Sequence, residues 1–389
     1  MLVVTANWGL TDGSLGGHGH ASATAWLDRL RAAVVRAGWG PTGRYRPVDR
    51  LTLVLAGDTF DLMFSERWNG RARPWHGGRE AREARLAVAA RAVTAVRRPI
   101  ATLHRWVRQG LVVPAADRRG RPVETMRARV EVDVVALAGD RDGDLATVAG
   151  GPIWRGIHLG SAWCDECRAI RHGHEFDPVR CAEGRVAHRL EARPTLGESV
   201  VVELLVPFSV ALRSMPEHWE KARPTLTALA GADLGEWVPL VVKLLAASPA
   251  RGRVALATAW RRAVDGWAAA VRREPPEHEA GFDAPGELGA WFATVGGPGT
   301  TGPAPAAIRW LAAAAPAAVP GRSAIFGHLS AAAIASGPVL GLGGRAPMLL
   351  VEPRPHGPLE IVDLGTRPRE SAIVRVGAPA TGRDSIDAA

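Results

Sequence analysis

The chain has little lysine, tyrosine or cysteine. Its 389 residues include one tyrosine, three cysteines and only two lysines, Lys221 and Lys243, so nearly all of the 48 basic residues are arginines. This skew, with abundant alanine, glycine and proline, is typical of a GC-rich genome, so the net charge of +9 does not by itself indicate a nucleic-acid-binding protein. Three cysteines are too few for a disulfide framework and fit a reducing compartment. For Cys164, Cys167 and Cys181 two interpretations stay open, a zinc site completed by a histidine and buried free thiols.

The sequence also lacks a long hydrophobic run and an export signal. Its longest apolar stretches, residues 200–212 and 306–319, are broken by charged residues and prolines and are too short for a membrane-spanning helix of about 18 residues or more. The N-terminal segment MLVVTANWGL has no basic flank and no signal cleavage site. We therefore expect a cytoplasmic protein.

Composition and charge distribution narrow the choice of protein class. Hydrophobic residues make up 47% and charged residues 22%, which excludes a disordered, collagen-like or coiled-coil chain. Between Arg67 and Arg129 there are 16 arginines against four acidic residues, so the positive charge is concentrated in one segment. Such a segment favours a phosphate-bearing substrate, an anionic membrane face or, less strongly, nucleic acid. A solvated helix face without a partner is the other interpretation.

Strand and helix patterns alternate along most of the chain. Short β-branched or Leu-rich runs that end in Gly, Asp, Asn or His predict strands at residues 2–5, 51–56, 130–138, 169–171, 324–326, 348–352 and 359–362. Helical periodicity predicts helices at residues 23–37 and 79–108, the second kinked or split at Pro99. This alternation predicts an α/β fold.

The amino-acid composition and periodicity change between residues 187 and 320. Ala-, Leu- and Trp-rich segments with helical periodicity are separated there by glycine and proline, and their tryptophans are expected to fill a core. We expect a helical insertion, or cap, at 187–320 within an α/β domain formed by 1–186 and 321–378, followed by a flexible tail at 379–389.

Polar clusters follow several predicted strands. Open α/β folds place ligands and catalytic groups at the carboxyl ends of strands. The clusters are Asp58 and Asp61, then Asp140, Asp142 and Asp144, then His172, His174 and Asp177, and finally His328. Carboxylates mixed with imidazoles are the donor set that binds Mn, Fe or Zn.

The order of these clusters resembles that of the calcineurin-like metallophosphoesterases, most closely the branch of the UDP-diacylglucosamine pyrophosphatases of the lipid A pathway. The motifs are GDTFD at 57–61, GDRD at 139–142, HGHEFD at 172–177 and GHLS at 327–330. The resemblance implies a four-layer αββα sandwich of two mixed sheets. It also implies metal-dependent hydrolysis of a phosphomonoester, phosphodiester or pyrophosphate bond, with a phosphate-containing small molecule or lipid as substrate.

By the same resemblance, one metal site is complete and the other is degenerate. The complete site would use Asp58, Asp140, His172 and His328. In the first motif Asn7 and Gly9 stand where the family has aspartate and histidine, and in the last motif Ser330 replaces a histidine. Two carboxylates and two neutral imidazoles neutralise one divalent ion, so one ion is expected. Two ions remain an alternative, in which His18, His20 or Asp12 completes the other site.

Arg141 stands where many relatives have a histidine that is thought to protonate the leaving group. Because arginine stays charged, we expect Arg141 to bind substrate phosphate. We expect His174 to take part in catalysis. Alternatively, His174 and Asp177 orient His172. A structural histidine is the other interpretation. The lost ligands leave a second function open, an inactive metallophosphoesterase-like module that binds or regulates.

Overall fold

A mixed sheet forms the centre of the computed structural model. The structure describes residues 1–40, 42–142, 154–165, 168–174, 193–231, 234–276 and 284–295, and five further strands between 323 and 376 by their backbone alone. The sheet has the strand order β12-β11-β10-β1-β2-β4-β3, with β5 beside β4. Its strands are β1 (Leu2–Thr5), β2 (Arg50–Ala56), β3 (Leu111–Ala116), β4 (Pro122–Leu137), β5 (His158–Gly160), β10 (Met348–Glu352), β11 (Leu359–Asp363) and β12 (Val374–Val376).

The central strands β1, β2, β4 and β5 are parallel, and the outer ones are antiparallel to their neighbours. A second sheet has the order β6-β7-β8-β9. Its strands are β6 (Ala162–Cys164), β7 (Arg168–Arg171), β8 (Ser323–Ser330) and β9 (Val339–Gly343). All the strands expected from the sequence are present, although β4 begins well before the expected residue 130.

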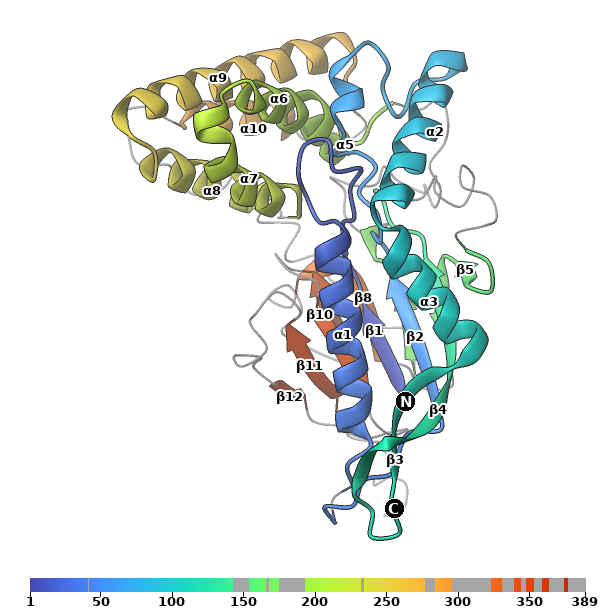
Figure 1. The fold of residues 1–389 in the computed structure, drawn as a ribbon. Helices are drawn as coiled ribbons and strands as arrows, with labels where there is room; N and C mark the ends of the chain where they lie inside the picture. The colour runs from blue at the N-terminus through green and yellow to red at the C-terminus, as the bar shows by residue number, and fades with distance from the viewer. Residues whose placement is uncertain are drawn as a thin grey trace, which may run out of the picture.

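Two helices pack on one face of the central sheet, α1 (His20–Ala37) and α3 (Arg97–Gln109), and α2 (Gly78–Ala95) extends beyond the strand ends (Figure 1). The predicted helix at 79–108 is interrupted at Val96. Pro99 explains the break, because it has no N–H to donate to the carbonyl of residue 95 and fits only in the first turn of the next helix.

The residues of β1 show how the layers are arranged. Val3 belongs to the large core that includes the helices, whereas Leu2 and Val4 lie in a separate cluster with Val54 of β2 and Ile170 of β7. Because successive side chains of a strand point to opposite faces, one face of the sheet is covered by helices and the other by the second sheet. The α/β class expected from the sequence is thus present.

Helices make up all the regular structure described between residues 196 and 293, and Figure 1 shows them gathered at one end of the molecule. We call this segment the helical lobe. It contains α5 (Leu196–Val200), the π-helix η3 (Val201–Leu205), α6 (Val206–Arg213), α7 (Pro216–Gly231), α8 (Leu234–Ala246), α9 (Ala250–Arg273) and α10 (Ala284–Ala293). Pro207 accounts for the π-helix, because a proline cannot donate to the carbonyl of Glu203 as the α-helical pattern requires.

Aromatic side chains fill the core of the helical lobe, as expected. Trp237, Trp260 and Trp267 are at most 1% exposed, and the rings of the last two contact Phe292 edge-on. The indole of Trp260 donates to the carbonyl of Phe292 at 2.9 Å, so its one polar atom is satisfied. None of the described helices combines the length and the apolar character that a membrane span requires. The expected tail at 379–389 lies outside the described residues.

Candidate metal centre

The polar clusters meet where the parallel strands end. The strands β1, β2 and β4 are neighbours in register, so their carboxyl ends lie at one edge of the sheet. Asn7, Asp58 and Asp140 follow these strands within three residues, and His172 follows β7 of the second sheet directly. The backbone N–H of Asn7 donates to the carbonyl of Gly57 at 3.2 Å, which holds the first two strand ends together.

Two residues at these strand ends have left-handed backbone conformations. Asn7 has a φ of 55° and Asp58 a φ of 48°, and they are the only non-glycine residues with positive φ among those described. This conformation costs about 1–2 kcal/mol for most residues and least for Asn and Asp. Backbone strain of this kind concentrates at functional sites, where the surrounding structure holds it in place.

Two glycines allow the loops to approach closely. A Cβ atom on Gly57 would collide with the ring of His172, and one on Gly139 would collide with the carboxylate and the backbone nitrogen of Asp58. Steric contact therefore explains why glycine precedes aspartate in both motifs. Each glycine makes room for a functional side chain from the other loop or the other sheet.

His172 lies between two carboxylates. Its Nε2 is 3.0 Å from Asp140 Oδ1 and 3.5 Å from Asp58 Oδ2, and all three residues are buried. Its Nδ1 is 2.9 Å from the carbonyl of Ala56, which can only accept a hydrogen bond, so Nδ1 carries a proton and Nε2 faces the carboxylates. Burial lowers the pKa of His172, but the charges and hydrogen bonds of Asp58 and Asp140 outweigh it and raise that pKa well above its usual value.

His174 joins this group. Ligand atoms of Asp140, His172 and His174 lie within 4.8 Å of one another, close enough to hold one metal ion. Oxygen and nitrogen donors with a carbonyl that orients His172 fit Mn, Fe or Zn. The sequence placed His174 beside the ligands and assigned His328 as the fourth one. His328 lies on β8, but its side chain is outside the described part of the structure.

Arg141 connects the centre to the helical lobe. It is 8% exposed, and its Nη1 donates to Asp61 Oδ2 at 2.9 Å and to the carbonyl of Ala230 in the last turn of α7. Its Nε lies 3.8 Å from Asp58 Oδ2, and its backbone N–H donates to Asp58 Oδ1. The nearby carboxylates raise the pKa of Arg141 although burial opposes them. The sequence assigned this guanidinium to substrate phosphate, and in the structure its partners belong to the protein itself.

Asp61 and Asp142 hold the loops in shape. Asp61 Oδ1 accepts the backbone N–H groups of Met63 and Phe64, while its other oxygen accepts from Arg141. Asp142 accepts backbone N–H groups from both Gly-Asp loops, at Gly139 and at Thr59. Burial raises the pKa of Asp142 to about 7. These carboxylates were part of the sequence motifs, but their role as backbone acceptors could not be read from the motifs.

The structure describes some of the side chains expected at the degenerate first site. Gly9 leaves a space that the ring of His18 approaches, with Cδ2 of His18 3.9 Å from the position of an added Cβ. The ring of His18 packs edge-to-face against Trp26, and burial lowers the pKa of His18. Asp12 is bound elsewhere, to Ser14 and Ser65.

Several predicted residues lie where their side chains are not described. Ser330 belongs to β8 and His20 begins α1, both known by backbone only. Asp144, Asp177, Cys167 and Cys181 lie outside the described residues, whereas Cys164 is exposed as a free thiol. The zinc-site interpretation involves Cys167 and Cys181, so it falls outside the described residues.

Comparison with known proteins yields no matching family model, no matching curated protein and no matching solved structure.

Proposed function

We propose that the chain is a metal-dependent phosphoesterase with one well-formed metal site. Its substrate would be a phosphate-containing small molecule or lipid with a phosphomonoester, phosphodiester or pyrophosphate bond. The observation that carries the proposal is the convergence of Asp58, Asp140 and His172, from three different strand ends, on one buried point. Two carboxylates and an imidazole are costly to desolvate, and a metal ion bound between them would offset that cost.

The proposed fold is the four-layer sandwich of the metallophosphoesterases. The helices α1 and α3 on one face of the central sheet and the second sheet on its other face support this proposal. The helical lobe contacts the strand-end loops through Arg141, which is where a cap over a substrate would lie.

Asp140, His172 and His174 would hold one Mn, Fe or Zn ion. Asp58 beside His172, and His328, are the further ligands that the resemblance implies. Such an ion lowers the pKa of a water molecule and offsets the charge of a phosphoryl group. The chain's own residues prepare the site. The Ala56 carbonyl directs Nε2 of His172 toward the carboxylates, and the backbone N–H of Arg141 fixes one oxygen of Asp58. Arg141 adds positive charge beside Asp58.

A second candidate is an inactive module that keeps the fold and one structural metal ion, and binds or regulates through its basic face. The first motif favours it, since Asn7 and Gly9 stand in place of two family ligands. The internal engagement of Arg141 with Asp61 and Ala230 favours it as well.

Metal content and turnover decide between these two functions. Elemental analysis of the purified protein should give one Mn, Fe or Zn ion per chain, and bis(p-nitrophenyl) phosphate should be hydrolysed with added manganese. Asp58→Ala and His172→Ala should lose both properties, while Asp28→Ala, an exposed aspartate of α1, should keep both. One ion without turnover on esters, pyrophosphate or nucleotides would favour the inactive module. No ion in the wild-type chain would overturn both, and two ions would overturn the single-site assignment.

A further inference from the structure

Residues 84–116 contain six arginines and no acidic residue. The segment covers most of α2, all of α3 and the strand β3. On the strongly amphipathic helix α3, Ile100, Leu103 and Trp106 are buried in the core. The remaining face is occupied by four exposed arginines, which we call the α3 ridge: Arg97, Arg98, Arg105 and Arg108.

Some arginines near the ridge in the sequence have acidic partners, whereas those of the ridge do not. Arg79 pairs with Glu83 at 2.7 Å, Arg121 with Asp117 at 3.5 Å and Arg127 with Glu124 at 3.3 Å. Within the described residues, none of the four ridge arginines forms an ion pair. Arg108 Nε donates a long hydrogen bond of 3.4 Å to the carbonyl of His104. No described carboxylate neutralises the charge of the ridge, and this charge can attract an external anion.

Two of these arginines stand where helix electrostatics disfavours a cation. Arg97 and Arg98 are the first two residues of α3, which has no acidic residue in its first turn. The positive end of the helix dipole repels cations there by about 0.3–1 kcal/mol each. Exposed residues that break a local rule with no compensating contact point to a function outside the fold.

We propose that the α3 ridge binds the phosphate backbone of duplex nucleic acid without reading its sequence. From Arg97 to Arg108 the helix rises about 16 Å, or roughly five base pairs at 3.4 Å per step. This span exceeds what one small phosphate ligand can contact. Guanidinium groups bind phosphate oxygens through paired hydrogen bonds, which suits arginine for this purpose.

A membrane surface fits the ridge less well than nucleic acid does. Helices that lie on membranes bury an apolar face in the lipid, but the apolar face of α3 is already buried in the protein core. The exposed residue between the ridge arginines is Ala101, whose side chain is too small to insert into a lipid bilayer. The ridge therefore offers charge alone, arranged in a line, and that is complementary to a linear polyanion.

The test measures binding of the full-length chain to a fluorescently labelled 24-base-pair duplex of mixed sequence. Anisotropy titrations between 50 and 200 mM salt should show affinity that falls steeply with salt. The variant R97A/R98A/R105A/R108A should bind at least tenfold more weakly at 50 mM salt, with a slope of log K against log salt that is smaller by about 0.9 for each lost phosphate contact. The lysine variant R97K/R98K/R105K/R108K should keep most of the salt dependence.

The matched control removes four exposed arginines from α9, as R251A/R253A/R261A/R262A, and changes the net charge equally. It should bind the duplex within about twofold of wild type. Circular dichroism checks that each variant is folded, and the experiment needs no enzymatic activity. Equal weakening by both alanine variants, or no duplex binding at 50 mM salt, would overturn the proposal. So would ridge-dependent binding to vesicles of phosphatidylglycerol with duplex binding unaffected.

Discussion

At the residue scale, two glycines decide how closely the metal-binding loops approach. In the Gly139→Ala variant the added methyl group would collide with the carboxylate and backbone nitrogen of Asp58. Neither group is the far end of a flexible side chain, so the loops must separate. We expect a loss of about 1–3 kcal/mol in the free energy of unfolding, measured by urea denaturation, together with weaker metal binding.

Gly266 provides the matched control for this substitution. It lies within α9, and a Cβ there meets no atom within 4 Å. Gly266→Ala should therefore raise the free energy of unfolding by about 0.5–1 kcal/mol, the usual difference between alanine and glycine inside a helix. Similar losses in both variants would show that the close approach at Gly139 has no special role.

The buried pair of Arg141 and Asp61 should contribute to the free energy of unfolding. Both are buried, and Arg141→Met would leave the carboxylates of Asp61 and Asp58 without their guanidinium. Removing one partner of a buried pair costs about 3–5 kcal/mol, because the other charge stays desolvated. The double variant Arg141→Met with Asp61→Leu should recover part of that loss. Urea denaturation of the full double-mutant cycle measures the coupling, and strict additivity would contradict the expectation.

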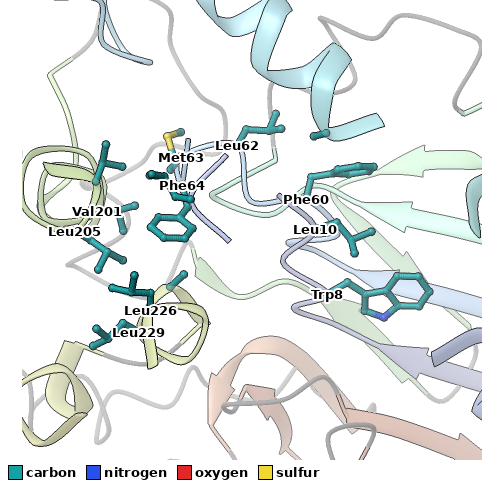
Figure 2. Close-up of a cluster of buried hydrophobic side chains, with 14 of the residues drawn as sticks. Trp8, Leu10, Phe60, Leu62, Met63, Phe64, Val201, Leu205, Leu226 and Leu229 are labelled. Atoms are coloured by element: carbon teal, nitrogen blue, oxygen red, sulfur yellow. The ribbon is translucent and has the colours of Figure 1, made fainter. Parts of the chain in front are cut away.

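At the element scale, the loop after β2 packs against both the sheet and the helical lobe. Figure 2 shows Phe60 near Leu10 and Trp8, whereas Phe64 lies among Val201, Leu205, Leu226 and Leu229 of the lobe. Asp58 lies at the start of this loop, so one short segment carries a candidate ligand and an anchor for the lobe. Arg73 pairs with Glu203 beside it, both largely buried.

Truncation of this anchor should therefore be costly. Phe64 is fully buried, and Phe64→Ala should lower the free energy of unfolding by about 3–5 kcal/mol. Leu86→Ala, on an exposed position of α2 that is 41% accessible, should change it by less than about 0.5 kcal/mol. Thermal unfolding followed by circular dichroism compares the two. A small effect of Phe64→Ala would mean that the lobe does not depend on this contact.

At the scale of the whole molecule, a bound metal should stabilise the fold. An ion that binds only the folded chain adds about 2.7 kcal/mol at a hundredfold excess over its dissociation constant. Manganese should thus raise Tm in differential scanning fluorimetry, EDTA should reverse the shift, and Asp140→Ala should abolish it. A Tm shift of equal size in Asp140→Ala would contradict the site.

The manganese-induced rise in Tm should depend on pH. In the metal-free chain the pKa of His172 is raised, so its protonated form stabilises the fold below the ordinary histidine pKa of about 6.5. That stabilisation is lost as pH rises through the raised pKa, and over the same range the ligands lose the protons that compete with metal. The manganese-induced rise in Tm should therefore grow between pH 6 and pH 8. A shift independent of pH would argue against His172 as a ligand.

The sequence by itself determined the local elements and the composition of the site. Alternating or continuous apolar runs placed β1 and β10 with their observed ends, and the helical period with Pro99 placed α2 and α3. Gly-Asp and His-Gly pairs after strands identified Asp58, Asp140 and His172, because parallel strands bring such residues to one edge. The early part of β4 was missed, since its exposed, charged residues do not show the pattern of a buried strand.

Only the tertiary structure decided which partners these residues have. Arg141 donates to the carbonyl of Ala230, 89 residues away, and nothing in either local sequence marks that contact. The steric need for Gly139 and the role of Asp142 as a backbone acceptor likewise depend on two loops 83 residues apart. Hydrophobic period and turn chemistry act over a few residues, whereas packing joins side chains without regard to their separation. Strand ends could therefore be predicted, but the contacts of Arg141 with Asp58, Asp61 and the helical lobe could not.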